Sequence, residues 1–599
     1  MNDSKSEART QAEPAMADPA QRIPAECHEG GRHVPPGSGK LYWFVALAGL
    51  CLFLITLTGL PELTGNEHRI GAYVMDAIRN GHWLVQRGFG GDVASKPPVL
   101  TWLVALATLG CGELTRLALY WPTAAATIVV ALVLLAWGKR YFGWEAGLLS
   151  AVSYLFSPVG FNQMMSVRYD GLLALPVTLA ALAAFRAWTL RTSWTWFWLA
   201  AAWGTLVKGP LALLLGAAGL LAVIWEKRTG HEAQLRGSHW WGGLCYLALC
   251  GGWFLLAYAD LGQPLVDKML GRELAGHVAG EGSSDRLLLG FYKPTGNVLA
   301  GYAPWSVFAV LGLWRVWRRP ATSPDERRLE RFLSCWFFVG LLVFSLAAHQ
   351  RGRLIVPLVP AVALLAGREL AGWLRPRPLL KLATAFVAIM LVAVALYHHV
   401  ARAWTREVQV TLGMRETAEV VRRTLGDQFP LVHVGASDSD TSFALQFYLN
   451  SAQPLASVER AAELLRGDYP AYVAVTGYGK HADQFENGLE LLEIARWPQT
   501  GTPTVRVVGN QPVTEATSRL AMLHGPFAIR MDQVQLVGVY RHDFTFRVPE
   551  SAGRISIQNQ SSEQQTVGIR VLSSTGKPGD TIKRRRLAPQ EIWSIAPDA

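Results

Sequence analysis

Two acidic residues, each close to an arginine, are the first candidates for chemistry in this 599-residue sequence. Glu67 lies in Gly65-Asn66-Glu67-His68-Arg69, and Asp170 lies in Arg168-Tyr169-Asp170-Gly171. A carboxylate held close to a cation is suited to act as the general base for an acceptor hydroxyl or amine. Each acid also has a purely structural interpretation, because acidic residues stabilise the first turn of a helix. The sequence leaves open whether Glu67 or Asp170 is the base.

Basic residues gather in the same segments as these acids, and they suggest what the site handles. Arginine and lysine bind phosphate groups through charge-assisted hydrogen bonds. Near a membrane they also extend toward lipid headgroups, which is the alternative interpretation for each of them. The candidate anion-binding residues are Arg69, Lys96, Arg168, Arg351 and Arg353, with Lys208, Arg272, Lys293 and the amide of Asn66 as further candidates.

The composition indicates that these segments belong to a membrane protein. The chain is 51% apolar and 17% charged, whereas soluble domains carry about 25% charged residues. The net charge of +11 lies entirely within residues 1–400, because residues 401–599 hold 21 basic and 21 acidic residues. Since the positive charge lies among the most apolar segments, we exclude a nucleic-acid-binding protein. Metal-ligand spacings such as CxxC or HExxH do not occur, so we expect no metal site.

Apolar runs of about twenty residues, the length that crosses a bilayer, recur along residues 41–400. We predict a polytopic α-helical membrane protein with about eleven spans and at most thirteen. The predicted spans are 41–60, 116–137, 145–164, 171–188, 194–208, 209–225, 240–259, 298–314, 332–348, 354–373 and 379–400.

The distribution of basic residues predicts the orientation of these spans. With the amino terminus in the cytoplasm, inner segments hold 22 Lys and Arg and outer segments hold 13, as the positive-inside rule requires. Residues 1–40 are then a disordered cytoplasmic tail. The outer loop 61–115 contains an apolar stretch after Lys96-Pro97-Pro98 that is too short to span, and we interpret it as a helix lying on the outer leaflet.

The pattern changes after residue 400, which predicts an extracytoplasmic C-terminal region in two parts. Residues 401–512 alternate helix and strand, as in a small α/β domain, with helices that include 441–449, 456–466 and 480–495. Residues 513–599 contain short alternating strands and are expected to form a β-sandwich. This region either recognises the acceptor or has a structural role.

Six segments in chain order resemble the bacterial aminoarabinose-to-lipid-A transferases and the related protein O-mannosyltransferases, which are GT-C membrane glycosyltransferases. Three departures distinguish this chain: Asn66 replaces the first acid of the family, Ser95 replaces a glutamate, and Leu354 replaces a tyrosine. The matching segments are Asn66-Glu67-His68-Arg69, Asn80-Gly81-His82-Trp83, Lys96-Pro97-Pro98 with Trp102, Arg168-Tyr169-Asp170, Lys208-Gly209-Pro210, and Gly352-Arg353-Leu354 with Pro357 and Pro360.

The resemblance implies transfer of a sugar from a polyprenyl-phosphate donor to a lipid, glycan or protein acceptor at the extracytoplasmic face of the bacterial cytoplasmic membrane. It implies Glu67, with or without Asp170, as base, and the basic residues as ligands of the leaving phosphate. We expect no cofactor, no metal requirement and a monomer in contact with membrane lipids. Two alternatives remain, a transporter or flippase of polyprenyl-linked glycans and a catalytically inactive relative.

Overall fold

The computed structural model describes most of residues 38–599. The segments left out are 1–37, 60–62, 64–66, 89–92, 112–113, 232, 270, 272–290, 348–351, 375–376, 426–430, 436–439, 450–454, 468–470, 478–489, 513–521, 525–526, 531–534, 540–543, 548–554, 560–563, 573–577, 589–590 and 596–599. The predicted disordered tail therefore lies outside the described residues.

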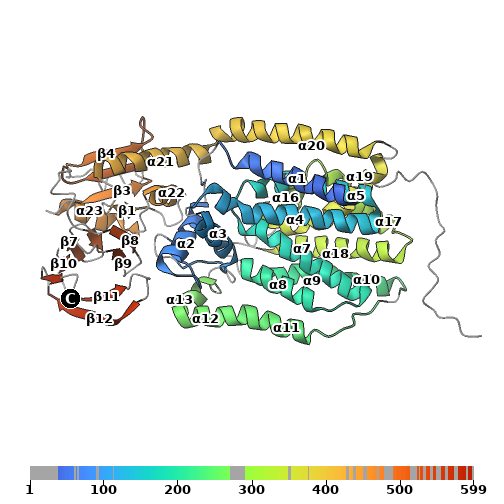
Figure 1. Cartoon of the computed structure of the whole chain (residues 1–599), viewed down its shortest axis with the longest axis horizontal. Coiled ribbons are helices and arrows are strands. Elements are labelled where there is room, and N and C mark those ends of the chain that lie inside the picture. The colour runs from blue at the N-terminus through green and yellow to red at the C-terminus, as the bar shows by residue number, and fades with distance from the viewer. Residues whose placement is uncertain are drawn as a thin grey trace, which may run out of the picture.

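The first two thirds of the chain form a bundle of helices that run roughly side by side (Figure 1). The first ten helices are α1 (Ser38–Thr56), α2 (Glu67–Asn80), α3 (Val99–Cys111), α4 (Arg116–Phe142), α5 (Trp144–Leu155), α6 (Pro158–Met164), α7 (Tyr169–Leu190), α8 (Thr195–Lys208), α9 (Leu211–Ala218) and α10 (Ala222–Arg228). The remaining ones are α11 (Trp240–Tyr246), α12 (Gly252–Leu261), α13 (Gln263–Val266), α16 (Lys293–Gly301), α17 (Ser306–Arg318), α18 (Pro324–Leu346), α19 (Val359–Leu374) and α20 (Leu379–Leu396).

Among the described residues, seven helical segments are long and apolar enough to cross a membrane, and an eighth results if the bent pair α16 and α17 counts as one span. The seven are Gly39–Thr56, Arg116–Phe142, Tyr169–Leu190, Trp240–Leu261, Pro324–Leu346, Gly352–Leu374 and Leu379–Trp404. The prediction of a polytopic helical membrane protein is confirmed.

The predicted count of about eleven spans is too high by this measure. The run 145–164 is divided into α5 and α6 at Ser157-Pro158, because proline cannot continue the hydrogen bonding of the preceding helix. The run 194–208 forms the short helix α8, which ends at Gly209 with φ of +99°, a conformation that glycine adopts readily. The run 209–225 forms α9 and α10 with a 3-10 turn between them.

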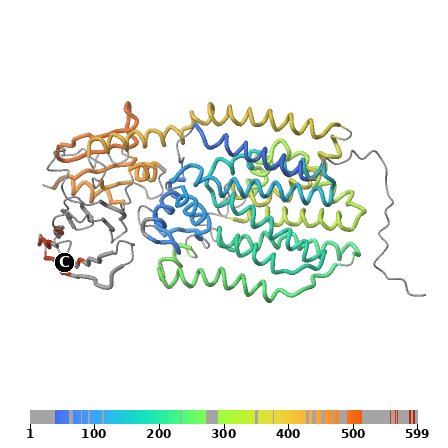
Figure 2. Tube along the Cα trace, in the orientation of Figure 1, coloured from blue at the N-terminus to red at the C-terminus, as the bar shows by residue number. Residues whose placement is uncertain are grey.

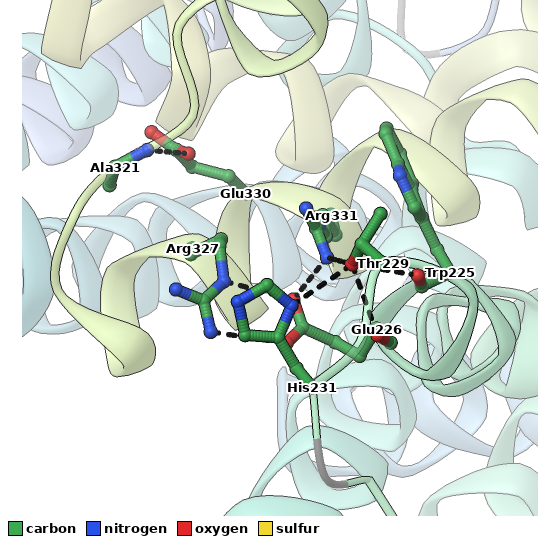
Figure 3. A network of polar contacts seen from close by, with 8 residues as sticks. All are labelled: Trp225, Glu226, Thr229, His231, Ala321, Arg327, Glu330 and Arg331. Carbon is green, nitrogen blue, oxygen red and sulfur yellow. Dashed lines mark hydrogen bonds and ion pairs between the residues drawn. The ribbon is translucent and has the colours of Figure 1, made fainter.

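Buried ion pairs hold one end of the bundle together (Figure 3). Glu226 at the end of α10 is fully buried and accepts hydrogen bonds from Arg331 (Nη1 to Oε1, 2.8 Å) and Arg327 (Nη2 to Oε2, 3.4 Å), both on α18. Glu330, also fully buried, pairs with Arg368 of α19 and accepts a hydrogen bond from the Ala321 backbone N–H at 3.0 Å. These pairs tie α10 and α19 to α18, although α10 lies far from α18 in the sequence.

Helices α2 and α3 lie at the other end of the bundle, next to the C-terminal region (Figures 1 and 2). With 13 residues, α3 is the short apolar helix that the sequence predicts after Lys96-Pro97-Pro98. The side of the membrane on which this end lies stays a prediction.

The C-terminal region contains a mixed five-stranded sheet with the order β2-β1-β3-β5-β4, followed by antiparallel strands. Its helices are α21 (Arg406–Leu425), α22 (Asp440–Leu449) and α23 (Val458–Arg466); the strands of the mixed sheet are β1 (Val432–Val434), β2 (Leu455–Ala456), β3 (Tyr472–Thr476), β4 (Leu492–Trp497) and β5 (Val505–Gly509). The later strands are β6 (Met522–His524), β7 (Phe527–Arg530), β8 (Gln535–Val539), β9 (Phe544–Arg547), β10 (Ile555–Asn559), β11 (Gln565–Leu572), β12 (Pro578–Leu587) and β13 (Ile592–Ile595).

The end of one predicted helix in this region is wrong. Residues 492–495 of the predicted helix 480–495 belong to strand β4, which pairs with β5 in antiparallel register, and residues 480–489 of that prediction lie outside the described residues. The four later strands β13, β10, β7 and β6 form one sheet, while β11–β12 and β8–β9 form separate hairpins. The domain boundaries at 401–512 and 513–599 stay predictions.

His433 on strand β1 makes the C-terminal region sensitive to acid. Burial lowers the pKa of His433 to about 3, against an ordinary value near 6.5, so the folded protein holds this ring neutral. As the pH falls, the unfolded chain binds a proton on this histidine before the folded protein does. The contribution of His433 to the free energy of unfolding is therefore fully present above pH 6.5 and is lost as the pH decreases from 6.5 toward 3. Between pH 7.5 and 5.5 we expect a loss of about 1.4 kcal/mol, measured by amide hydrogen exchange of β1 and β3 corrected for intrinsic rates. His433→Leu should remove this pH dependence, and an unchanged slope in that variant would contradict the assignment.

Candidate active site

The carboxylate of Glu67 is buried at the start of α2, where two donors bind it. Its Oε2 accepts a hydrogen bond from the Tyr120 hydroxyl of α4, and its Oε1 accepts one from the backbone N–H of Val167 at 2.9 Å. Only 4% of the Glu67 surface is exposed, so the carboxylate is largely shielded from solvent. Hydrogen bonds to both oxygens fix its orientation, as an acid–base group requires.

The segment that supplies the Val167 N–H is itself tied to three helices. The hydroxyl of Thr123 on α4 donates to the Ser166 carbonyl at 3.0 Å, and Thr56 at the end of α1 donates to the Met164 carbonyl at 3.2 Å. Arg402, which follows α20, donates to the Met165 carbonyl at 3.3 Å. These hydrogen bonds fix the position of the turn between α6 and α7, and with it the position of the Val167 N–H that binds Glu67.

The second acid, Asp170, lies three residues after Val167 in the first turn of α7, and two cations contact it. Lys208 at the end of α8 donates to its Oδ1, and Arg353 lies 3.6 Å from its Oδ2 (Nε to Oδ2). Asp170 is 5% exposed, whereas the side chains of Lys208 and Arg353 are 15% and 29% exposed. Three motifs that are separate in the sequence thus meet in one cluster, with the cations on its more open side.

Part-buried polar contacts connect the described residues of the loop between α2 and α3. Asp76 of α2 binds the His82 ring at 3.1 Å (Oδ1 to Nδ1) and accepts a hydrogen bond from the Arg87 backbone N–H at 2.7 Å. The indole of Trp102 on α3 donates to the Trp83 carbonyl at 2.6 Å. Lys96 is half-buried, three residues before the start of α3.

The other predicted site residues are distributed unevenly. Arg69 is half-buried, and its guanidinium lies 5.1 Å from the centre of the Phe443 ring on α22. Arg168 is half-buried directly before α7, and Lys293 is exposed at the start of α16, where no ion pair links it to either acid among the described residues. Asn66, Arg272 and Arg351 lie outside the described residues.

Two site residues were not identified from the sequence as partners of Glu67. Tyr120 binds Glu67 directly, and the guanidinium of Arg116 lies 4.9 Å from the centre of the Tyr120 ring. Arg116 and Tyr120 are four residues apart at the start of a predicted span, so they lie on one face of that helix. This spacing is the sequence pattern that could have identified them as a pair. Within the described residues, no group of three or more His, Cys, Asp or Glu side chains could hold a metal ion.

Comparisons with known proteins agree with the motifs. Residues 95–254 match the family model described as dolichyl-phosphate-mannose-protein mannosyltransferase. The matched segment covers about a quarter of this chain. An undecaprenyl phosphate-alpha-4-amino-4-deoxy-L-arabinose arabinosyl transferase of Sodalis glossinidius is 27% identical over 66% of this chain and 74% of its own length. A transferase of the same description from Pseudomonas fluorescens is 24% identical over 55% of this chain, and the match spans only 59% of that relative.

Solved crystal structures have a fold similar to that of this chain. The crystal structure of ArnT from Cupriavidus metallidurans, bound to undecaprenyl phosphate, superimposes with a TM-score of 0.62 at 18% identity and covers 80% of this chain and 99% of ArnT. The ligand-free ArnT structure gives a TM-score of 0.60 at 19% identity. The predicted resemblance to the aminoarabinose transferases is therefore confirmed, in sequence by relatives of 24–27% identity and in fold by the ArnT structures.

Proposed function

We propose that this chain transfers a sugar from a polyprenyl-phosphate donor to a lipid, glycan or protein acceptor at the extracytoplasmic face of the membrane. The observation that carries the proposal is the buried Glu67 carboxylate, held by Tyr120 and the Val167 N–H and followed two residues later by Arg69. The distant homology to polyprenyl-phosphate-dependent transferases supports the choice of donor.

Glu67 acts as the general base in this proposal. The acceptor oxygen or nitrogen attacks the anomeric carbon of the sugar and passes its proton to the Glu67 carboxylate. The bond between the anomeric carbon and the phosphate oxygen breaks, and the electron pair leaves with the polyprenyl phosphate. Because the buried carboxylate is fixed on both oxygens, little reorganisation is needed when it accepts the proton.

Basic residues stabilise the negative charge that develops on the leaving phosphate. Arg69 and Lys96 lie at the first turn of α2 and immediately before α3, and we assign them the phosphate together with Arg168 and Arg353. Preoriented cations in a partly desolvated site stabilise such a charge strongly. The expectation that no metal is required stays a prediction, which transfer in the presence of a chelator tests.

Asp170 is better suited to position cations than to accept a proton. One oxygen of Asp170 contacts Lys208 and the other contacts Arg353, so the carboxylate holds both cations in place. We therefore assign the base to Glu67 and a positioning role to Asp170. The two cations would then be available to the donor phosphate on their exposed sides.

Mass spectrometry of lipids and glycans from cells with and without the protein tests the proposed function and identifies the sugar and the acceptor. We expect one glycosylated species to disappear without the protein and to return with the wild-type chain, but not with Glu67→Gln. Accumulation of an unmodified lipid-linked glycan on the cytoplasmic side would instead indicate a flippase.

Replacement of Lys96 by alanine is expected to weaken donor binding. Loss of one charge-assisted hydrogen bond to phosphate corresponds to about 1.5–3 kcal/mol, or roughly a tenfold to hundredfold increase in Kd. Binding of undecaprenyl phosphate to the purified full-length protein measures this change, with Lys139→Ala at the far end of α4 as the matched control. Equal affinity of Lys96→Ala and the control would remove Lys96 from the phosphate site.

A further inference from the structure

Helix α22 of the C-terminal region contributes side chains to two hydrophobic cores at once. Phe447 packs against the core of the helical bundle, while Ala444, Leu445 and Tyr448 pack in the core around the five-stranded sheet. Phe443 and Phe447 are four residues apart and therefore lie on one face of α22. That face is directed toward the first turn of α2.

The residues of α2 that meet this face directly follow Glu67. The His68 ring is buried, and it lies edge-on to Phe447 and to Tyr448, with centroid distances of 5.9 Å and 6.1 Å. The guanidinium of Arg69 lies 5.1 Å from the centre of the Phe443 ring, an arrangement that favours a cation through the charge distribution of the ring.

The two helices approach closely at Gly71. A methyl group on Gly71 would lie 3.1 Å from Leu63 and 3.2 Å from the Phe447 ring, so only a residue without a side chain fits there without displacing its neighbours. Close packing of this kind transmits a change in side-chain volume on one helix to the position of the other. The first turn of α2 is thus fixed from one side by Tyr120 and Val167 and from the other by α22.

We infer that Phe443 and Phe447 are positioning residues for the reaction, so that the C-terminal region completes the active site rather than only covering it. The inference rests on the proposed function of Glu67 and Arg69. Phe447 fixes His68 and with it the backbone that carries the Glu67 carboxylate. Phe443 holds the Arg69 guanidinium in the orientation from which it binds the donor phosphate.

The two aromatic residues should have separable effects. Phe443→Leu keeps apolar bulk but removes the ring face, so undecaprenyl phosphate should bind about tenfold more weakly. Phe447→Ala leaves space beside His68, and the resulting displacement of Glu67 should lower kcat about tenfold to a hundredfold while Kd changes less than threefold. Phe447→Leu, which restores most of the volume, should recover most of kcat.

The test uses full-length protein in lipid nanodiscs with two readouts. One is the Kd for undecaprenyl phosphate, and the other is the release of undecaprenyl phosphate from an undecaprenyl-phosphate-linked sugar with acceptor lipids present. Leu464→Ala is the matched control, because Leu464 on α23 is half-buried against the other face of the five-stranded sheet. It should leave both readouts within threefold of the wild type.

Wild-type values in both readouts for Phe443→Leu and Phe447→Ala would overturn the inference. An equal loss in Leu464→Ala would overturn it as well, because the effect would then follow from general destabilisation of the C-terminal region. Failure of the wild-type protein to release undecaprenyl phosphate from any donor would count against the proposed function itself. The binding readout would still decide the role of Phe443.

Discussion

Glu67→Gln is expected to lower the rate of sugar transfer by about 10²–10⁴-fold, the contribution typical of a positioned general base. Glutamine has the same shape, and its amide oxygen can still accept the hydrogen bond from the Val167 N–H. The amide cannot take up the acceptor proton. Because the packing is preserved, we expect the fold and the affinity for undecaprenyl phosphate to change little.

The rate of polyprenyl phosphate release by the purified protein measures this effect. Glu145→Gln is a suitable control, because Glu145 is a half-buried glutamate in the first turn of α5, away from the Glu67 contacts. Asp170→Asn should affect donor binding more than kcat if Asp170 positions Lys208 and Arg353. A Glu67→Gln rate within threefold of the wild type would transfer the role of base to another group.

Glu226→Ala is expected to have the largest effect on stability. It leaves Arg331, whose side chain is 6% exposed, without the carboxylate that now lies 2.8 Å away. Removal of one member of a buried ion pair costs about 3–5 kcal/mol, since the remaining charge stays desolvated. The free energy of unfolding in mixed micelles, followed by circular dichroism, measures this loss.

A double variant separates the cost of an unpaired charge from the net contribution of the pair. Glu226→Leu combined with Arg331→Met removes the closer pair and keeps apolar volume. Arg327 loses its 3.4 Å contact with Glu226 but is more exposed than Arg331, so the double variant should recover at least half of the loss. Arg460→Ala, which removes an exposed pair with Glu463 at 2.7 Å, should cost about 1 kcal/mol or less. Loss below 1 kcal/mol in Glu226→Ala would show that the network contributes little to stability.

The sequence predicted the long spans well. In a membrane, an uninterrupted apolar run such as that of α4 can hydrogen-bond its backbone N–H and C=O groups in few ways other than an α-helix. One error in the span count arose at a break that a short-range signal does mark, because Ser157-Pro158 divides an apolar run that hydropathy alone would join. The predicted spans 194–208 and 209–225 were divided correctly at Gly209, but their helices α8, α9 and α10 are shorter than a membrane span requires. The first residues of strand β4 were mistaken for the end of a helix because pairing with β5 decides their conformation, and β5 is itself held in the sheet by strand β3, which is more distant in the sequence.

The contacts of the candidate site were harder to predict than its residue types. The motifs identified Glu67, Asp170, Lys208 and Arg353 individually. The meeting of Asp170 with Lys208 and Arg353 depends on how α7, α8 and the Gly352–Leu358 turn pack, and no local pattern encodes it. The contact between α2 and α22 joins segments from opposite halves of the chain, so it could only be seen in the folded structure.

The most direct test of the central claim is the release of undecaprenyl phosphate from an undecaprenyl-phosphate-linked sugar by the reconstituted full-length protein. Membrane lipid extract supplies the acceptor, and mass spectrometry follows both products. We predict that the sugar appears on an acceptor in equal amount to the undecaprenyl phosphate released, and that both products disappear in Glu67→Gln. Transfer that continues undiminished in Glu67→Gln, or no transfer from any polyprenyl-phosphate sugar, would contradict the account.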